Sequence, residues 1–114
     1  MMIKRPLESD RAELIESATG YWAKITQGDR RGADRHTRAG ERIVGRWHAE
    51  GRVDALLCPL LEHASEEVRY AAAAHLFSLN LAREVPVAVL EELAKNPAGL
   101  VAPTARLLLQ SRPR

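Results

Sequence analysis

Residues 53–79 read VDALLCPLLEHASEEVRYAAAAHLFSL and carry the clearest structural pattern of the chain. A leucine-rich segment at 53–63 is followed by a short polar turn, and a second segment at 66–79 places apolar residues at helical spacing. Ser65 is suited to cap the second segment, and the two glutamates after it lie where the helix dipole favours negative charge. We therefore expect two antiparallel helices, with Pro59 kinking the first or shifting its start.

The same spacing of apolar residues predicts four further helices outside this stretch. Asp34 is a plausible N-cap for the second helix of the chain, while Gly28 and Gly51 end the first two. Asn80 and Asn96-Pro97 are stop signals further on. Short connections imply antiparallel neighbours, so we expect about three stacked helical hairpins in a single all-α domain over residues 1–114. The expected further helices cover residues 9–27, 34–50, 86–96 and 99–111.

The composition supports a folded helical domain. The chain has 114 residues, of which 46% are hydrophobic and only 4% aromatic, and its formal net charge is +2. Disordered chains combine low hydrophobicity with high net charge, so disorder is excluded. No apolar stretch approaches the roughly 18 residues of a spanning helix, and charged residues follow Pro6 where a signal peptide needs an apolar core. With Cys58 as the single cysteine, we expect a cytoplasmic protein with no membrane association.

The 53–79 segment resembles a HEAT-type repeat. The resemblance rests on the leucine-rich first helix, the acidic turn, Val68-Arg69, the alanines at 71–74 and Leu76. It implies a short α-α superhelix, in which Arg69 makes structural hydrogen bonds at the turn rather than contacts with a ligand. Residues 87–109 fit a second, degenerate hairpin that lacks the Val-Arg pair.

Most of residues 10–110 also resemble a group of small bacterial proteins of unknown function built on this plan. The resemblance strengthens the expected HEAT-like fold and implies no activity, because the group has none established. Its features here are Tyr21 and Ala23 near the end of the first helix, the Gly28-Asp29 turn, the Leu-rich segment 56–61, the 63–72 turn and repeat signature, and Leu-Glu-Glu-Leu-Ala at 90–94.

An arginine stripe is the strongest candidate for a binding surface. Its members recur at steps of four, three, four and four residues, which places them within an arc of about 80° on one helix. Residues 30–52 contain seven basic and three acidic residues, a local charge of +4, and residues 53–95 contain three basic and seven acidic residues, a local charge of −4. The stripe consists of Arg31, Arg35, Arg38, Arg42 and Arg46.

Two functions fit this stripe. Arginines present bidentate donors that could follow the phosphates of a nucleic acid. A charged helix face is more often solvated, however, and this one could pair with the acidic second half of the molecule or with another chain. The arginine excess, 14 of 17 basic residues, is also what a GC-rich genome produces. A net charge of +2 gives little of the field typical of nucleic-acid binders, so protein binding is the favoured interpretation.

No catalytic constellation is visible, and we expect no enzymatic activity, catalytic residue, metal site or cofactor. The four histidines, His36, His48, His63 and His75, form no His-x-x-x-His pair, and no second cysteine offers metal-ligand spacing. The adjacent pairs Glu66-Glu67 and Glu91-Glu92 point about 100° apart, so neither can share a proton as an acid–base dyad does. Cys58 is expected to be a buried small hydrophobe, and Trp22 and Trp47 are expected to anchor helix contacts.

The sequence thus favours a non-enzymatic protein-interaction module with an unidentified protein partner. Nucleic-acid binding through the arginine stripe is the alternative. Self-association is a further expectation, because an exposed apolar end at Leu100, Leu107 or Leu108 would be covered by a second copy.

Overall fold

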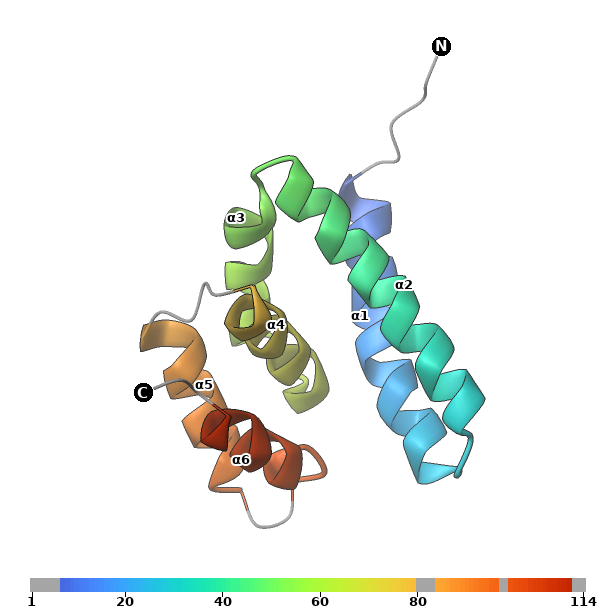
Figure 1. Cartoon of the computed structure of the whole chain (residues 1–114), viewed down its shortest axis with the longest axis vertical. Helices are drawn as coiled ribbons and strands as arrows, with labels where there is room; N and C mark the ends of the chain where they lie inside the picture. The colour runs from blue at the N-terminus through green and yellow to red at the C-terminus, as the bar shows by residue number, and fades with distance from the viewer. Residues whose placement is uncertain (1–6, 80–83, 97–98, 112–114) are drawn as a thin grey trace. The chain divides into compact units, whose positions relative to one another are not determined.

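The computed structural model describes residues 7–79, 84–96 and 99–111. Every regular element within these residues is helical, which confirms the expected all-α class (Figure 1). The chain divides into two compact units, Met1–Glu50 and Gly51–Arg114. The expectation of a single domain over residues 1–114 stays a prediction. The expected stop signals Asn80 and Pro97 lie outside the described residues.

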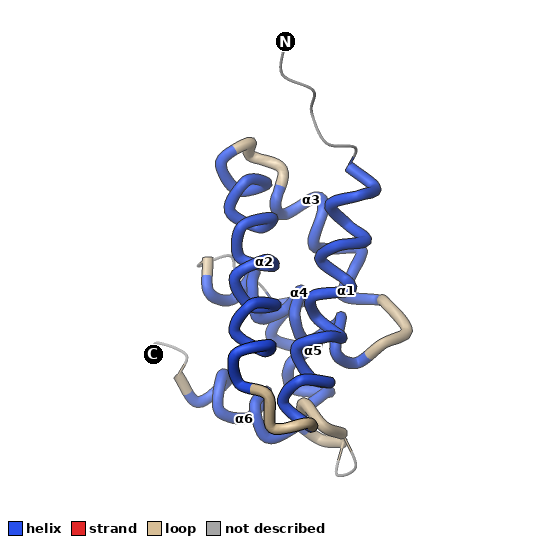
Figure 2. The backbone as a smooth tube through the Cα atoms, turned by 90° about the vertical axis from the view of Figure 1, so that its right-hand side faces the viewer, coloured by secondary structure: helices blue, strands red, loops and turns tan. Residues whose placement is uncertain are grey.

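The first unit is a hairpin of two long helices, α1 (Leu7–Thr26) and α2 (Arg30–Ala49), joined by a short turn (Figure 2). The expected anchors are confirmed, because the exposed fractions of Trp22 and Trp47 are 7% and 1%. The two helices bury a mixed set of apolar residues. On α1 and α2 these are Leu14, Ala18, Trp22, Ala33, Ile43, Val44 and Trp47.

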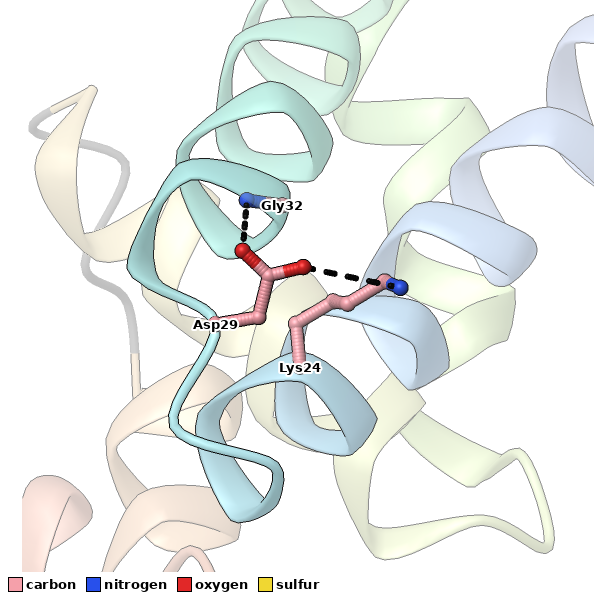
Figure 3. Close-up of polar contacts among 3 residues, drawn as sticks. All are labelled: Lys24, Asp29 and Gly32. Atoms are coloured by element: carbon pink, nitrogen blue, oxygen red, sulfur yellow. Dashed lines mark hydrogen bonds and ion pairs between the residues drawn. The ribbon is translucent and has the colours of Figure 1, made fainter.

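The turn between the helices sets where α2 begins. Gly28 has φ of +75°, a left-handed conformation that glycine adopts without strain and that ends α1. Asp29 then caps α2, because its Oδ1 accepts a hydrogen bond of 2.9 Å from the Gly32 N–H, while its Oδ2 lies 3.7 Å from Lys24 Nζ (Figure 3). The expectation that Asp34 is the N-cap is therefore wrong, because the N-cap is Asp29, five residues earlier.

Gly32 lies close to this cap. A Cβ atom at Gly32 would lie 2.6 Å from Asp29 Oδ2 and 2.8 Å from Lys24 Cδ, closer than atoms pack. The glycine that argues against a helix here in the sequence is thus the residue that leaves room for the capping carboxylate.

Within its described residues, the second unit contains four α-helices and one 3-10 helix. Pro59 lies in the first turn of the 3-10 helix, which confirms that it interrupts the leucine-rich helix. Pro86 and Pro103 lie in the first turns of α5 and α6. Backbone N–H groups of a first turn make no hydrogen bond within the helix, so a proline there removes none. The elements are α3 (Val53–Leu57), η1 (Cys58–Glu62), α4 (Glu66–Ser78), α5 (Glu84–Ala94) and α6 (Ala102–Gln110).

Helix α4 is the centre of the second unit. It packs against α3 and η1 on one side and against α5, which in turn contacts α6. Ala72 and Ala73 are at most 1% exposed, and their small side chains let the neighbouring helices approach closely. Leucines complete this core, with Leu57, Leu76 and Leu90 fully buried.

The turn before α4 is held by three side chains. The Ser65 hydroxyl caps the helix by accepting from the Val68 N–H, as expected. His63 Nδ1 accepts from the Ser65 N–H at 3.0 Å. Arg69 Nη1 donates to the carbonyl oxygens of His63 and Ala64 at 2.8 and 3.2 Å. Arg69 therefore makes structural hydrogen bonds, and His63 orients the turn.

The expectation that Cys58 is a buried hydrophobic residue is wrong, because Cys58 is exposed. Helix α3 ends at Leu57, and the tighter winding of η1 turns Cys58 and Pro59 outward while Leu60 and Leu61 face the core. The Cys58 thiol lies 3.3 Å from Asp54 Oδ1, one turn back along the chain.

The cap at Asp29 predicts a pH-dependent stability of the hairpin. The hydrogen bond from the Gly32 N–H, with smaller contributions from Lys24 and Arg35, lowers the pKa of Asp29 in the folded chain. The carboxylate therefore stabilises the fold fully above its unfolded pKa of about 3.9, and this contribution is lost as the pH falls through the lower folded value.

At pH 7 we expect the melting temperature to be highest for the wild type, lower for Asp29→Asn and lowest for Asp29→Ala. Asparagine keeps a hydrogen-bond acceptor but loses the charge, and alanine loses both. The difference between wild type and Asp29→Asn should shrink as the pH falls below about 3.9 in thermal unfolding followed by circular dichroism. A difference that is constant between pH 7 and pH 3 would contradict this role for the charge.

Candidate interaction surface on the first hairpin

The five arginines of the stripe all lie on α2, and all five are exposed. At 100° per residue they occupy an arc of about 80°, while the buried residues of α2 centre about 140° away. The stripe thus faces away from the core of the hairpin. The buried residues that define the opposite face are Gly32, Ala33, Gly40, Ile43, Val44 and Trp47.

Arg46 differs from the other four arginines because it has an intramolecular partner. Its Nη2 donates to Asp10 Oδ1 of α1 at 2.9 Å, and the Asp10 side chain is only 9% exposed. The Arg46 side chain keeps 44% of its surface exposed. Arg46 lies at the edge of the stripe nearest the buried face, so it joins the two helices rather than standing wholly in solvent.

The remaining four arginines form a continuous basic line. Within the part of the chain that the structure describes, no ion pair or hydrogen bond holds the side chain of Arg31, Arg38 or Arg42. Arg35 contributes to the lowered pKa of Asp29, so its charge acts partly on the turn. From Arg31 to Arg42 the line is about 16 Å long, with successive charges about 4.5 to 6 Å apart along the axis.

Two carboxylates border this line. Asp34 and Glu41 are exposed and project on the same side of the stripe, about 60° to 80° around the helix from Arg31. They limit the width of the basic surface. Its shape is therefore a narrow row of planar guanidinium groups, which suits a row of carboxylates or phosphates presented at similar spacing.

The histidines lie apart from one another. His36 is half-buried against α1, and His48 is exposed near the end of α2. His63 holds the turn before α4, and His75 is half-buried on α4. Among the described residues, no group of three or more His, Cys, Asp or Glu side chains is placed to hold a metal ion.

The two glutamates at the start of α4 lie in different environments. Glu66 Oε1 accepts a hydrogen bond from Asn96 Nδ2, which links the start of α4 to the segment that follows α5. Burial raises the pKa of Glu67, and the adjacent Glu66 charge adds to the effect. The ionised form of the Glu67 carboxyl is therefore less favourable in the folded chain than in water.

The apolar residues considered for self-association are only partly available. Leu100 and Leu107 are 51% and 66% exposed. Leu108 is half-buried, and it contributes less to this surface than expected. Single exposed leucines are common on folded chains, so they define no interface by themselves.

Comparison with known proteins finds no family model that matches the chain, and no curated protein or solved structure that is similar to it. No helix among the described residues combines the length and the apolar character needed to cross a bilayer. The candidate surface therefore has to be judged from its own geometry.

The contact between Asp10 and Arg46 predicts a measurable coupling. In a double-mutant cycle of Asp10→Ala and Arg46→Ala, we expect a coupling free energy of about 1 kcal/mol, because one partner is buried and the other is half in solvent. Arg46→Ala and Asp10→Ala should each lower the free energy of unfolding, since each removes one partner of this contact.

Urea unfolding at pH 7 measures these differences. Arg42→Ala, one turn earlier on the same helix, is the matched control and should change the free energy of unfolding by less than about 0.5 kcal/mol. A coupling of zero within error would show that the ion pair does not stabilise the hairpin.

Proposed function

We propose that this chain is a non-enzymatic protein-interaction module whose arginine stripe docks against an acidic surface of another protein. The observation that carries the proposal is the exposed row of four arginines on α2, opposite the face that packs on α1. Held on a two-helix hairpin, the row presents its charges with little conformational freedom in the backbone. The partner is a protein that presents carboxylates in a row, such as an acidic face of a helix.

The width of the stripe favours a protein partner. Asp34 and Glu41 border the row, so a broad anionic surface laid across α2 would meet their negative charges. A single helix with acidic residues three and four positions apart would contact the arginines alone. Arg46, paired with Asp10, contributes less than the other four.

The proposed fold behind this function is a short HEAT-like α-α superhelix of about three hairpins in one cytoplasmic domain. Supporting observations are the pairing of α1 with α2, of α3 and η1 with α4, and of α5 with α6. The capped turn before α4 and the hydrogen bonds of Arg69 within it agree with the repeat-like pattern of that segment. Such stacks offer broad surfaces for partners.

Nucleic-acid binding is the second candidate, and the arginine spacing is what favours it. Guanidinium groups about 4.5 to 6 Å apart along α2 could contact successive phosphates. Binding through four such contacts would give a logarithmic salt slope of about −3 to −4.

A salt titration separates the two candidates. We expect no binding of a fluorescent 20-base-pair duplex in anisotropy measurements, even at 25 mM salt. Binding with the steep salt slope above, lost in Arg38→Glu/Arg42→Glu and kept in Arg30→Glu, would instead establish the nucleic-acid function.

A pull-down from the native cell tests the protein partner. Wild type and Arg30→Glu should retain the same protein, while Arg38→Glu/Arg42→Glu should bind it at least about tenfold more weakly. Arg30 is a suitable control because it is exposed on α2 but lies off the stripe. The proposal would be rejected if all three variants retained the partner protein equally. It would also be rejected if the segment of the partner that contacts α2 contained no acidic residues.

A further inference from the structure

The first hairpin carries a second polar feature, a groove between α1 and α2 that shares no residue with the arginine stripe. The groove has a volume of about 570 Å³ and is open to solvent along one side. Its small residues, Ala12 of α1 and Ala39 of α2, keep the two helices from filling it. Its polar lining consists of Ser9, Glu13, Glu16 and Ser17 of α1 and His36 of α2.

Ser17 shows that the groove is prepared for a polar group. Its exposed fraction is 6%, and its hydroxyl makes no hydrogen bond within the described residues. Three threonines of the same hairpin bond to the carbonyl four residues before them, the usual solution for a hydroxyl in a helix. Ser17 makes no such bond, and its hydroxyl, on a residue that is only 6% exposed, lines the groove and is available to a ligand there.

His36 is held in place on the other wall. A Cβ atom at Gly20 would lie 2.5 Å from His36 Cε1 and 2.6 Å from Nε2. The imidazole ring therefore rests on the bare backbone of α1 at Gly20. This contact accounts for a glycine inside α1, where it lowers helix propensity.

The chemistry of the lining selects a cation. The carboxylates of Glu13 and Glu16 only accept hydrogen bonds, and the imidazole nitrogen of His36 and the Ser17 hydroxyl can accept as well. A planar guanidinium, with five N–H donors, matches this set of acceptors better than a single-point ammonium.

We infer that the groove between α1 and α2 binds the guanidinium of an arginine side chain presented by a partner protein. The open side of the groove admits the end of a long side chain while its backbone stays outside. This site does not depend on the arginine stripe, and it holds whether or not the stripe binds an acidic partner.

The test is a ¹⁵N–¹H NMR titration of the full chain at pH 7 with Nα-acetyl-arginine methylamide. We expect saturable shifts of the amides of Ser17, His36 and Ala39, with a dissociation constant on the order of 1 mM for so small a probe. The citrulline analogue, which has the same shape without the charge, should produce no saturable shift. Equal responses to both probes would overturn the assignment.

Two variants and a control sharpen the test. Glu16→Gln, at an exposed position, should weaken binding at least about fivefold, while Glu8→Gln, on the same helix and outside the groove, should leave it unchanged. Unaltered binding in Glu16→Gln would also overturn the proposal.

Ser17→Ala distinguishes binding from structure. The change replaces serine in the middle of α1 with the best helix former, so the melting temperature should rise. The affinity for the arginine probe should nevertheless fall. A variant that is more stable and binds equally well would show that Ser17 takes no part in the site.

Discussion

The turn at residues 27–29 determines how the first hairpin presents its charges. Gly28 ends α1 in a left-handed conformation, and Asp29 begins α2 by accepting the Gly32 N–H. These two residues fix the rotation of α2 about its axis relative to α1. A start one residue earlier or later would rotate every side chain of α2 by about 100° around the helix, with arginines directed toward α1 and apolar residues toward solvent.

The buried face of α2 then dictates the roles of its arginines. Ile43, Val44 and Trp47 pack inward. The arginines of the stripe, which follow one another at steps of three and four residues, therefore point outward. Arg46 lies nearest the boundary between the faces and meets Asp10 of α1. One arginine of a regular stripe is thus used to hold the helices together, and the others are left to solvent or a partner. Charge-reversal experiments should therefore avoid Arg46, since its replacement by Glu would place two carboxylates beside each other.

Helical periodicity was sufficient to predict the all-α class and most helix bounds, because apolar spacing reflects burial directly. The start of α2 was missed because two arginines and Gly32 argue against a helix N-terminus, and the reason for Gly32 is visible only when the Asp29 cap is seen. Cys58 was assigned to the core because its neighbours are apolar, but η1 winds more tightly than an α-helix and turns it outward.

The stripe and the groove differ in how much of each the sequence could predict. The stripe lies on one helix, so a single periodicity defines it. The groove joins residues 9–17 to residues 36–39, and its prediction requires the register of α1 against α2. Gly20 is the residue of the sequence that indicates a close contact here, because a glycine inside a helix with apolar spacing often marks a place where another group approaches the backbone. The partner of that approach, the His36 ring, could not be named without the fold.

The two surfaces would affect a shared partner in different ways. Exposed charges such as those of the stripe act over a Debye length of about 8 Å at physiological salt, so they mainly accelerate encounter and are sensitive to ionic strength. A guanidinium in the groove interacts only after contact, with acceptors that are partly shielded from water, and its loss would mainly speed dissociation. A partner with an acidic row and a protruding arginine would therefore use the stripe to find this hairpin and the groove to remain on it.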